Sequence, residues 1–332
     1  MGAHHTIKLF LVGILSFLLI SACSGDVSQK LNSHSSKPLL ATSSSGTESS
    51  CRAVKHVLGE TCVPANPQRI VVVDGMTLDA VLALGMKPIA ATEPGLVGSR
   101  AHYLKGRAEG IASAGQDGQP NLERLVLLNP DLILGFNSAL QNYKVFSQIA
   151  PTIPSKYVHT AWKDDLRRIG DILNRTQQAE RLLSQYQERA EKLRVATGNR
   201  LEKTEVSVVR FMAAKGNTHF RTRYSFPGSV LEDVGFPSPA AQRRATKSKV
   251  PYVSISLERP DLLDGDVIFA ALDPGSEGSL NQFETSPLWQ RLKAAQNKRV
   301  YTVDSGYWTF GNILAANAIL DDLFKYLVQG QR

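Results

Sequence analysis

The stretch Thr176–Thr197, TQQAERLLSQYQERAEKLRVAT, contains neither glycine nor proline. Its apolar side chains recur at helical spacing and form one stripe, made of Ala179, Leu182, Leu183, Tyr186, Ala190 and Leu193. Thr176 can cap the start of such a helix, and Gly198-Asn199 supplies a left-handed stop at its end. At about 1.5 Å per residue the helix would extend about 33 Å. A helix of this length can join two compact lobes.

Buried strands alternate with helices on the N-terminal side of this stretch. Continuous apolar runs predict strands at 69–74 (RIVVVD), 87–92 (KPIAAT) and 131–134 (DLIL). Helices are expected at 76–84, 122–128 and 139–149. Strands that are apolar on both faces, alternating with amphipathic helices, indicate a parallel sheet covered on both sides.

The same pattern returns on the C-terminal side. Strands are expected at 206–211 (VSVVRF), 267–271 (VIFAA) and 300–303 (VYTV), and helices at 229–234, 288–294 and 314–327. The sequence therefore predicts an α/β fold of two parallel-sheet lobes joined by a single long helix. A ligand would lie between the lobes, at the carboxyl ends of the strands. The expected boundaries are 51–161 for the first lobe, 162–198 for the linker with its long helix, and 199–332 for the second lobe.

The N-terminal residues predict export and a lipid anchor. Residues 9–20 (LFLVGILSFLLI) are an apolar run of 12 behind Lys8, too short for a mature membrane span but typical of a signal peptide. The run ends in Ile20-Ser21-Ala22-Cys23, the lipobox pattern of bacterial lipoprotein signals. We therefore expect a signal peptide at 1–22 and a lipid on Cys23. The alternative is an ordinary cleaved signal with a chance cysteine.

A tether and a disulfide are expected after the signal. Residues 24–50 contain 10 serines and no aromatic residue, which is typical of a flexible linker, so 23–50 is interpreted as a lipid-anchored tether. Cys51 and Cys62 stand 11 positions apart in an exported chain, where a disulfide is expected to contribute about 3 kcal/mol. Two free thiols or a metal-binding pair are the alternatives, although no His or third Cys stands at ligand spacing.

The net charge and the absence of common enzyme motifs limit the functions that the sequence favours. The chain has 38 Lys+Arg and 30 Asp+Glu, a formal net charge of +8, which becomes +7 when Lys8 leaves with the signal. A moderate positive balance without a long basic run favours an anionic small ligand over nucleic acid. The sequence contains no dinucleotide-binding glycine motif, Walker loop, nucleophile elbow or zinc-protease motif. Enzyme motifs are therefore missing from the sequence or weak.

Four further segments resemble a known family. They are GETCVPANPQRIVVVD at 59–74, NLERLVLLNPDLIL at 121–134, SISLERPDLLDGDVIF at 254–269, and Trp308 followed by LAANAILDDLFKYL at 314–327. In this order and spacing they are similar to the class III periplasmic binding proteins, the substrate receptors of ABC importers for ferric siderophores and cobalamin. The resemblance covers nearly all of 51–328. It implies a binding role without catalysis, cofactor or direct metal ligands. It also implies two lobes joined by a rigid helix, modest closure on ligand, and a monomer.

The resemblance also implies a partner. Receptors of this class use one acidic residue in each lobe to dock on arginines of the permease dimer, which works with an ATPase. The matching positions are Glu123 and Glu258. Each stands at the start of a helical segment, so local stabilisation of the helix end is the alternative role.

The candidate ligand contacts carry guanidinium and aromatic groups. Arg100 and Tyr103 stand on the long loop after the second predicted strand, at a possible rim of the cleft. The resemblance implies further contacts from Arg210, Arg221, Arg223, Tyr224 and Trp308. Guanidinium groups bind carboxylates in bidentate geometry, and flat rings cover apolar arms, which suits a ferric hydroxamate or ferric citrate complex. A solvated surface is the alternative role for Arg221 and Arg223. Arg221 stands where some relatives carry a tyrosine, which leaves the siderophore open.

Other functions remain possible from the sequence. A haem or cobalamin receptor of the same fold is the first alternative, and direct ferric ion binding through tyrosines is another. An exported enzyme that processes metal chelates belongs to a different class, and would need a converging ligand set or titratable pair. A signalling or adhesion lipoprotein would lack a ligand-sized cleft.

Overall fold

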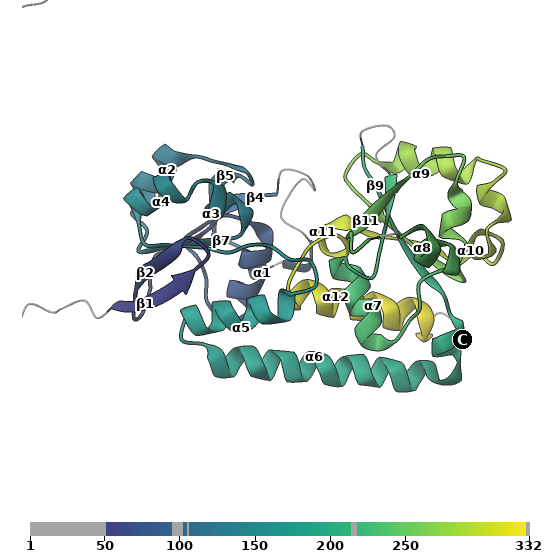
Figure 1. Ribbon diagram of the computed structural model, residues 1–332, viewed down its shortest axis with the longest axis horizontal. Coiled ribbons are helices and arrows are strands. Elements are labelled where there is room, and N and C mark those ends of the chain that lie inside the picture. Colours follow the sequence, from purple (N-terminus) through teal and green to yellow (C-terminus); the bar gives the residue numbers. More distant parts are fainter. Residues whose placement is uncertain (1–50, 95–101, 105, 214–217, 247, 330–332) are drawn as a thin grey trace, which may run out of the picture. The chain divides into compact units, whose positions relative to one another are not determined.

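The computed structural model describes residues 51–329 except 95–101, 105, 214–217 and 247 (Figure 1). The expected signal peptide, Cys23, the tether up to residue 50, and Arg100 lie outside the described residues. Within the described part of the chain, no helix is both long enough and apolar enough to cross a bilayer.

The N-terminal lobe is built on a six-stranded sheet. Its strands are β3 (Ile70–Val72), β4 (Ala90–Glu93), β5 (Ala112–Gln116), β6 (Gln119–Pro120), β7 (Leu132–Gly135) and β8 (Thr152–Pro154). They are arranged in the order β6-β5-β4-β3-β7-β8, and every neighbouring pair is parallel except β5 and β6. Val71 and Ile133 face one apolar cluster, whereas Ile70 and Leu134 face another. The prediction of a parallel sheet buried on both faces is confirmed for this lobe.

In the described residues of this lobe, four α-helices and one 3-10 helix accompany the sheet. They are α1 (Gly75–Ala83), η1 (His102–Leu104), α2 (Leu122–Leu128), α3 (Asn137–Gln141) and α4 (Tyr143–Ile149). The continuous helix expected over 139–149 is interrupted at Asn142. The Asn142 side chain donates to the Ser138 carbonyl at 2.9 Å, a local bond that competes with the helical pattern.

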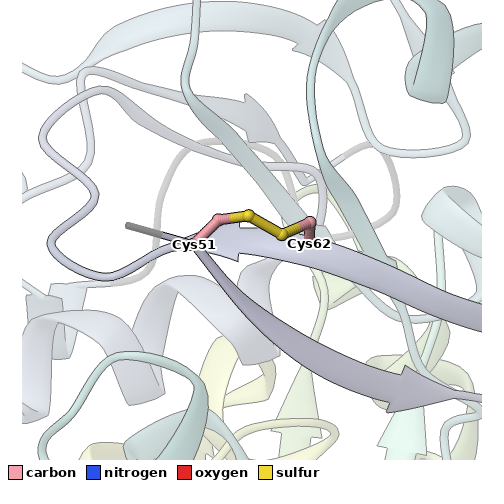
Figure 2. The surroundings of a disulfide bond; sticks show 2 residues. All are labelled: Cys51 and Cys62. Atoms are coloured by element: carbon pink, nitrogen blue, oxygen red, sulfur yellow. A yellow bond between two sulfur atoms is a disulfide. The ribbon is translucent and has the colours of Figure 1, made fainter. Parts of the chain in front are cut away.

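A disulfide-bonded hairpin precedes the sheet. Strands β1 (Cys51–His56) and β2 (Gly59–Pro64) pair antiparallel, and the turn includes Gly59 at φ 139°. Cys51 and Cys62 form a disulfide with their Cα atoms 5.4 Å apart (Figure 2). The predicted pairing of these two cysteines is present in the hairpin, and the other two arrangements considered do not apply.

The C-terminal lobe contains a five-stranded mixed sheet. Its strands are β9 (Val206–Phe211), β10 (Thr218–Arg221), β11 (Tyr252–Ile255), β12 (Val267–Leu272) and β13 (Val300–Asp304). Their order is β11-β10-β9-β12-β13, with β9, β12 and β13 parallel and β10 and β11 antiparallel to their neighbours. The three parallel strands were expected from their apolar runs. Strands β10 and β11 were not, because THFR and YVSI are short and interrupted by polar residues.

The remaining helices of this lobe are short apart from the last. They are η2 (Gly198–Lys203), α7 (Phe226–Val234), α8 (Ala240–Ala245), η3 (Pro260–Leu263), α9 (Glu277–Glu284), η4 (Trp289–Arg291), α10 (Lys293–Gln296), α11 (Ser305–Trp308) and α12 (Ile313–Leu327). The helix expected over 288–294 is instead divided between η4 and α10, with extended backbone at Leu292.

The long helix α6 spans Thr176–Thr197, the same residues as the prediction. Ala179, Leu183, Tyr186, Ala190 and Leu193 of the predicted stripe are buried. Gly198 ends the helix with φ 58°, as expected. The predicted N-cap is wrong, because Arg175 occupies that position and no side chain caps the helix. The Arg175 N–H instead donates to the Gly170 carbonyl of the preceding helix α5 (Trp162–Ile172).

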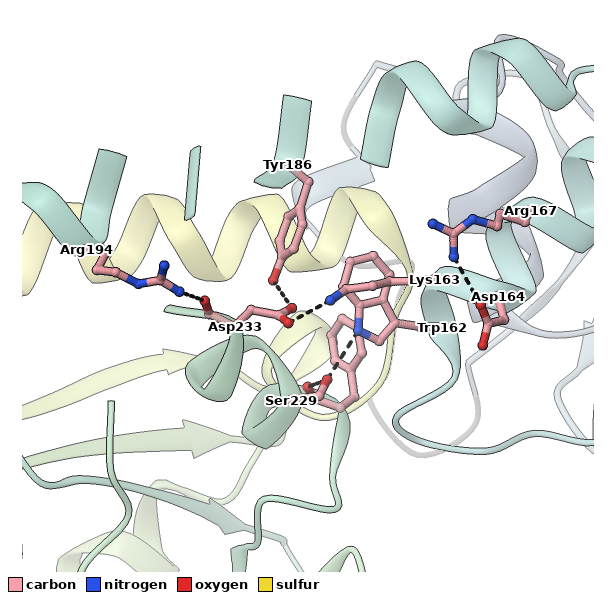
Figure 3. A network of polar contacts seen from close by, with 9 residues as sticks. Trp162, Lys163, Asp164, Arg167, Tyr186, Arg194, Ser229 and Asp233 are labelled. Atoms are coloured by element: carbon pink, nitrogen blue, oxygen red, sulfur yellow. Dashed lines mark hydrogen bonds and ion pairs between the residues drawn. The ribbon is translucent and has the colours of Figure 1, made fainter. Parts of the chain in front are cut away.

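A polar network joins α5 and α6 to α7 (Figure 3). The Asp233 carboxylate on α7 accepts from Lys163 Nζ at 2.6 Å and from the Tyr186 hydroxyl at 2.8 Å. Arg194 donates to the Asp233 carbonyl at 2.7 Å, and Trp162 Nε1 donates to Ser229 Oγ at 3.2 Å. Helices α5 and α6 are therefore bound to the C-terminal lobe by named polar contacts as well as by apolar packing.

Candidate ligand-binding site

Two adjacent strands, β9 and β10, bring nitrogen-bearing side chains to one face of the C-terminal sheet. Arg210 on β9 is the register partner of His219 on β10, and Arg221 on β10 is the partner of Tyr252 on β11. Because side chains alternate along a strand, His219 and Arg221 lie on the same face as Arg210. Phe220 between them belongs to the apolar cluster on the opposite face. The alternation thus concentrates positive charge on a single face.

Arg210 is neutralised by a buried carboxylate. Its Nε and Nη2 atoms each donate to an Asp273 oxygen at 2.8 Å. The two side chains are only 3% and 5% exposed. This is the bidentate geometry in which a guanidinium and a carboxylate bind most strongly. Arg210 therefore contributes little net charge to the site.

Arg221 is buried without a hydrogen-bond partner. It is 3% exposed, and neither its Nε nor its two Nη atoms has a partner. Burial first, and then the neighbouring Arg210 charge, lowers the pKa of the Arg221 guanidinium to about 9. At pH 7 the group is still charged, so the fold holds an isolated buried cation, an arrangement with a substantial free-energy cost.

Aromatic rings cover the two guanidinium groups. The Phe310 ring centre lies 5.8 Å from Cζ of Arg210 and 5.6 Å from Cζ of Arg221. The Tyr252 ring centre lies 5.5 Å from Cζ of Arg221. These separations are within the range of cation–π attraction, which partly offsets the missing hydrogen bonds.

The segment 155–161, which follows β8, supplies further rings. His159 stacks on Phe310 with centroids 5.7 Å apart, and Tyr157 meets the same ring edge-on at 6.2 Å. Phe136, which follows β7, lies 5.5 Å from Tyr157. We call the following set the arginine–aromatic cluster: Tyr157, His159, Arg210, His219, Arg221, Tyr252 and Phe310. The cluster contains residues from both lobes.

The histidines of the cluster are neutral at pH 7. Burial and the Arg221 charge lower the pKa of His159 to about 4, and burial with Arg221 and Arg210 lowers that of His219 to about 3. Nδ1 of His159, Nε2 of His219 and the Tyr157 hydroxyl have no hydrogen-bond partner. The cluster therefore offers guanidinium charge together with several unused neutral polar atoms.

Two carboxyl groups outside the C-terminal lobe act on the cluster, Asp74 in the N-terminal lobe and Asp165 on α5. Burial raises the pKa of Asp74 to about 6 and that of Asp165 to about 7, and both charges act on the Tyr157 hydroxyl. Asp74 accepts from the Thr77 and Phe136 amides at 2.8 Å each, which caps α1. The two lobes thus present groups of opposite sign near the same tyrosine.

Arg223 and Tyr224 lie apart from the cluster contacts. Arg223 is exposed and ion-paired with Glu232 of α7, and its guanidinium lies 5.7 Å from the Tyr224 ring. Arg223, Glu232 and Arg221 also line a pocket of about 400 Å³ against α7. The structure therefore brings Arg210 and Arg221 of the predicted contacts together, whereas Arg223 contacts Glu232 and Tyr224 instead of the cluster.

Trp308 and Tyr103 lie in the packed interior. Trp308 is 0% exposed, stacks on Phe269 at 4.5 Å and donates its Nε1–H to Asp322 at 2.8 Å. Tyr103 meets Tyr307 edge-on at 5.7 Å and hydrogen-bonds to the Asp79 carboxylate. These settings favour structural roles for both residues.

A scan of protein families matches residues 70–307 to the family described as periplasmic binding protein. The match covers more than half of the chain. This chain belongs to the periplasmic binding protein family.

Individual relatives extend over the whole chain. A probable siderophore-binding lipoprotein, YfiY of Bacillus subtilis, is 31% identical over 97% of this chain and 98% of its own length. The Fe(3+)-citrate-binding protein YfmC of the same organism is 29% identical over 97% of each chain. The crystal structure of Staphylococcus aureus SirA complexed with staphyloferrin B superimposes with a TM-score of 0.74 at 26% identity, over 83% of this chain and 98% of that chain.

Sequence reasoning missed five members of the cluster in this periplasmic binding protein: Tyr157, His159, His219, Tyr252 and Phe310. Tyr157 and His159 belong to a connecting segment, and Phe310 to a turn before α12. Their one visible signal was an aromatic or imidazole ring in a loop next to a predicted strand or helix end. That signal is too common to select these residues without their spatial neighbours.

Glu123 and Glu258 are both exposed. Glu123 lies in the first turn of α2, flanked by the exposed apolar residues Leu122 and Val126. Glu258 lies in the turn before η3, where a hydrogen bond with Ser256 lowers its pKa. Both carboxylates are thus free to meet a partner.

Among the residues that the structure describes, no group of three or more His, Cys, Asp or Glu side chains could hold a metal ion.

Proposed function

We propose that this periplasmic binding protein is a lipid-anchored, extracytoplasmic receptor that binds a ferric siderophore carrying carboxylate groups and delivers it to an ABC permease. The observation that carries the proposal is Arg221, a buried guanidinium whose three nitrogen atoms have no partner. A carboxylate oxygen would provide the missing acceptor and balance the charge. Relatives described as binding a siderophore and ferric citrate support this ligand class.

The chemistry of the cluster fits an anionic chelate. Ferric citrate-type complexes present negatively charged oxygen atoms at their edge, which bidentate guanidinium donors recognise well. Neutral His159 and His219 and the Tyr157 hydroxyl can add uncharged hydrogen bonds. Phe310 and Tyr252 provide flat apolar surface against the organic part of the complex. The chelator itself holds the iron, which is the cargo.

Ferric citrate binding by an Arg221→Met variant tests this proposal. Methionine retains much of the arginine stem and removes the charge, so we expect about 100-fold weaker binding, or roughly 2.7 kcal/mol. Intrinsic fluorescence quenching of the purified protein measures the affinity. A neutral ferric trihydroxamate should be affected much less, because it has no carboxylate for Arg221 to bind.

Arg167→Met is the matched control. Arg167 lies on α5, is exposed, and pairs with Asp164 and Glu180, so its loss should leave ferric citrate affinity within about twofold. Equal affinity of wild type and Arg221→Met for ferric citrate would refute the role of Arg221. Binding of haem or cobalamin in preference to every ferric chelate would replace the proposed ligand class.

Delivery to the permease would use Glu123 and Glu258. Replacing both with arginine should leave ferric citrate affinity unchanged and abolish iron uptake by cells, since the docking charges are reversed. Glu188→Arg, a reversal at an exposed position on α6, is the control and should transport normally. Normal uptake by the double variant would remove the docking role.

A further inference from the structure

A carboxylate of the N-terminal lobe caps the last long helix of the C-terminal lobe. Asp79 belongs to α1 and is 0% exposed. Its Oδ2 atom accepts from the Asn312 and Ala315 amides at 3.0 and 2.9 Å, and Oδ1 accepts from the Leu314 amide at 2.8 Å. The Tyr103 hydroxyl adds a fourth hydrogen bond. One side chain thus binds the first turn of α12 from 233 residues away.

The position of this carboxylate is physically favourable. The first amides of a helix have no partner within the helix, and the positive end of the helix dipole attracts a negative charge. A capping side chain ordinarily comes from the residue next to the helix. Here the adjacent residue, Asn312, binds the Ile313 amide and donates Nδ2–H to the Trp162 carbonyl at 3.1 Å. The start of α12 is therefore fixed to α1 and α5.

Phe310 stands two residues before the capped turn. Its ring covers the guanidinium groups of Arg210 and Arg221. Gly311 connects the ring to the cap in a packed setting, because a Cβ atom there would meet the Ala315 Cβ at 2.1 Å and the Phe226 ring at 3.2 Å. A connection this short and crowded transmits a displacement of the capped turn to the ring.

We propose that Asp79 is a positioning residue for ligand binding: by capping α12 it holds Phe310 over the arginine pair. This inference rests on the proposed function, because the affected site is the arginine–aromatic cluster. Asp79 acts through Phe310 and does not touch the chelate.

A double-mutant cycle between Asp79 and Phe310 tests the proposal, with ferric citrate as the probe. Asp79→Asn removes the negative charge and turns amide hydrogens toward backbone N–H groups, so we expect about tenfold weaker binding. In a Phe310→Ala background the same substitution should cause no further loss, because the ring that it positions is absent. A purely structural role would give additive effects in the cycle.

Asp131→Asn is the matched control. The Asp131 carboxylate accepts from the Gln68 and Arg69 amides at 2.7 and 2.9 Å, entirely within the N-terminal lobe. Asp131→Asn makes the same chemical change at a carboxylate that binds backbone amides. The effect of this variant on ferric citrate affinity should be small and independent of Phe310.

Hydrogen–deuterium exchange supplies a readout that needs no ligand. Asp79→Asn should raise exchange of peptides covering residues 309–316 at least tenfold, and Asp131→Asn should not. If Asp79→Asn fails to fold, Tyr103→Phe removes one hydrogen bond to the same carboxylate and should show a smaller effect of the same kind.

The outcomes separate the two proposals. Additive effects in the cycle, or unchanged exchange over 309–316, would overturn the positioning role. Failure of the wild type to bind ferric citrate would count against the proposed ligand, and the exchange measurement would still decide whether Asp79 holds the Phe310 loop.

Discussion

Arg210 and Arg221 lie on neighbouring strands of one sheet, point to the same face and are each 3% exposed. They differ in their partners. Arg210 forms a bidentate pair with Asp273, whereas no atom of the Arg221 guanidinium has a hydrogen-bond acceptor. Burial therefore does not distinguish a structural arginine from a ligand-binding one. The distinction lies in whether the fold has already supplied the counter-charge.

The two arginines are also expected to differ in their effect on the stability of the folded protein. A buried pair with full hydrogen bonding is close to balanced, whereas a buried charge without a partner destabilises the folded state. A ligand that provides hydrogen-bond acceptors for the Arg221 guanidinium would offset part of this destabilisation on binding. Three stability measurements test this difference between the arginines.

The largest effect is expected when Arg210 is made to resemble Arg221. Asp273→Ala leaves the Arg210 charge buried and unpaired, so the free energy of unfolding should fall by about 3–5 kcal/mol. Urea denaturation measures the change. The control is Asp261→Ala, since Asp261 pairs with Arg259 in the same bidentate geometry at 2.8 and 2.9 Å but both side chains are more than half exposed. That substitution should cost at most about 1 kcal/mol.

A gain in stability is expected at Arg221. Arg221→Met replaces an unpaired buried cation with an apolar side chain of similar length, so the free energy of unfolding should rise by about 1–3 kcal/mol. Arg210→Met should do the reverse, because it leaves the Asp273 carboxylate without its partner. If Arg221→Met destabilised the protein as much as Arg210→Met, the proposed difference between the two arginines would be wrong.

The smallest effect concerns His219, which faces both guanidinium groups. Its pKa is about 3 in the folded protein and 6.5 ordinarily, so below pH 6.5 the unfolded chain binds a proton that the folded chain does not. The free energy of unfolding therefore falls as pH decreases from 6.5 toward 3. Between pH 7 and pH 5 the free energy of unfolding should decrease in both proteins. The decrease should be about 1 kcal/mol smaller in His219→Gln than in wild type, after discounting for solvent screening. Parallel stability–pH curves for the two proteins would contradict this assignment.

Much of the fold was predictable because its signals are local. The bounds of α6 follow from an apolar stripe without glycine or proline and from the positive φ of Gly198. Strands β9 and β12 were predicted within one residue because each is a continuous apolar run. Strands β10 and β11 escaped prediction because their polar residues belong to the cluster and the sheet edge. The apolar periodicity that predicts strands is therefore weakest in the strands that carry the candidate site.

The candidate site was predictable only in part, for a related reason. Arg210 and Arg221 were selected because the matching region of related receptors contributes polar contacts to the cleft. The resemblance also selected Trp308, whose ring lies in the core against Phe269. The direction and partners of a side chain depend on register and on distant segments, which composition and spacing do not encode.

By itself, the sequence determined two α/β lobes, the long helix between them and an excess of positive charge, because periodicity and composition are properties of contiguous residues. Only the tertiary structure decided which arginine is neutralised. Asp273 pairs with Arg210, which lies 63 residues away in the sequence. The Phe310 ring covers both arginines, and it lies beside the start of α12, which Asp79 caps. The Arg210–Asp273 pair forms only when the C-terminal sheet assembles, and the Asp79 cap forms only when α1 packs against α12, since these contacts join groups that are distant in the sequence.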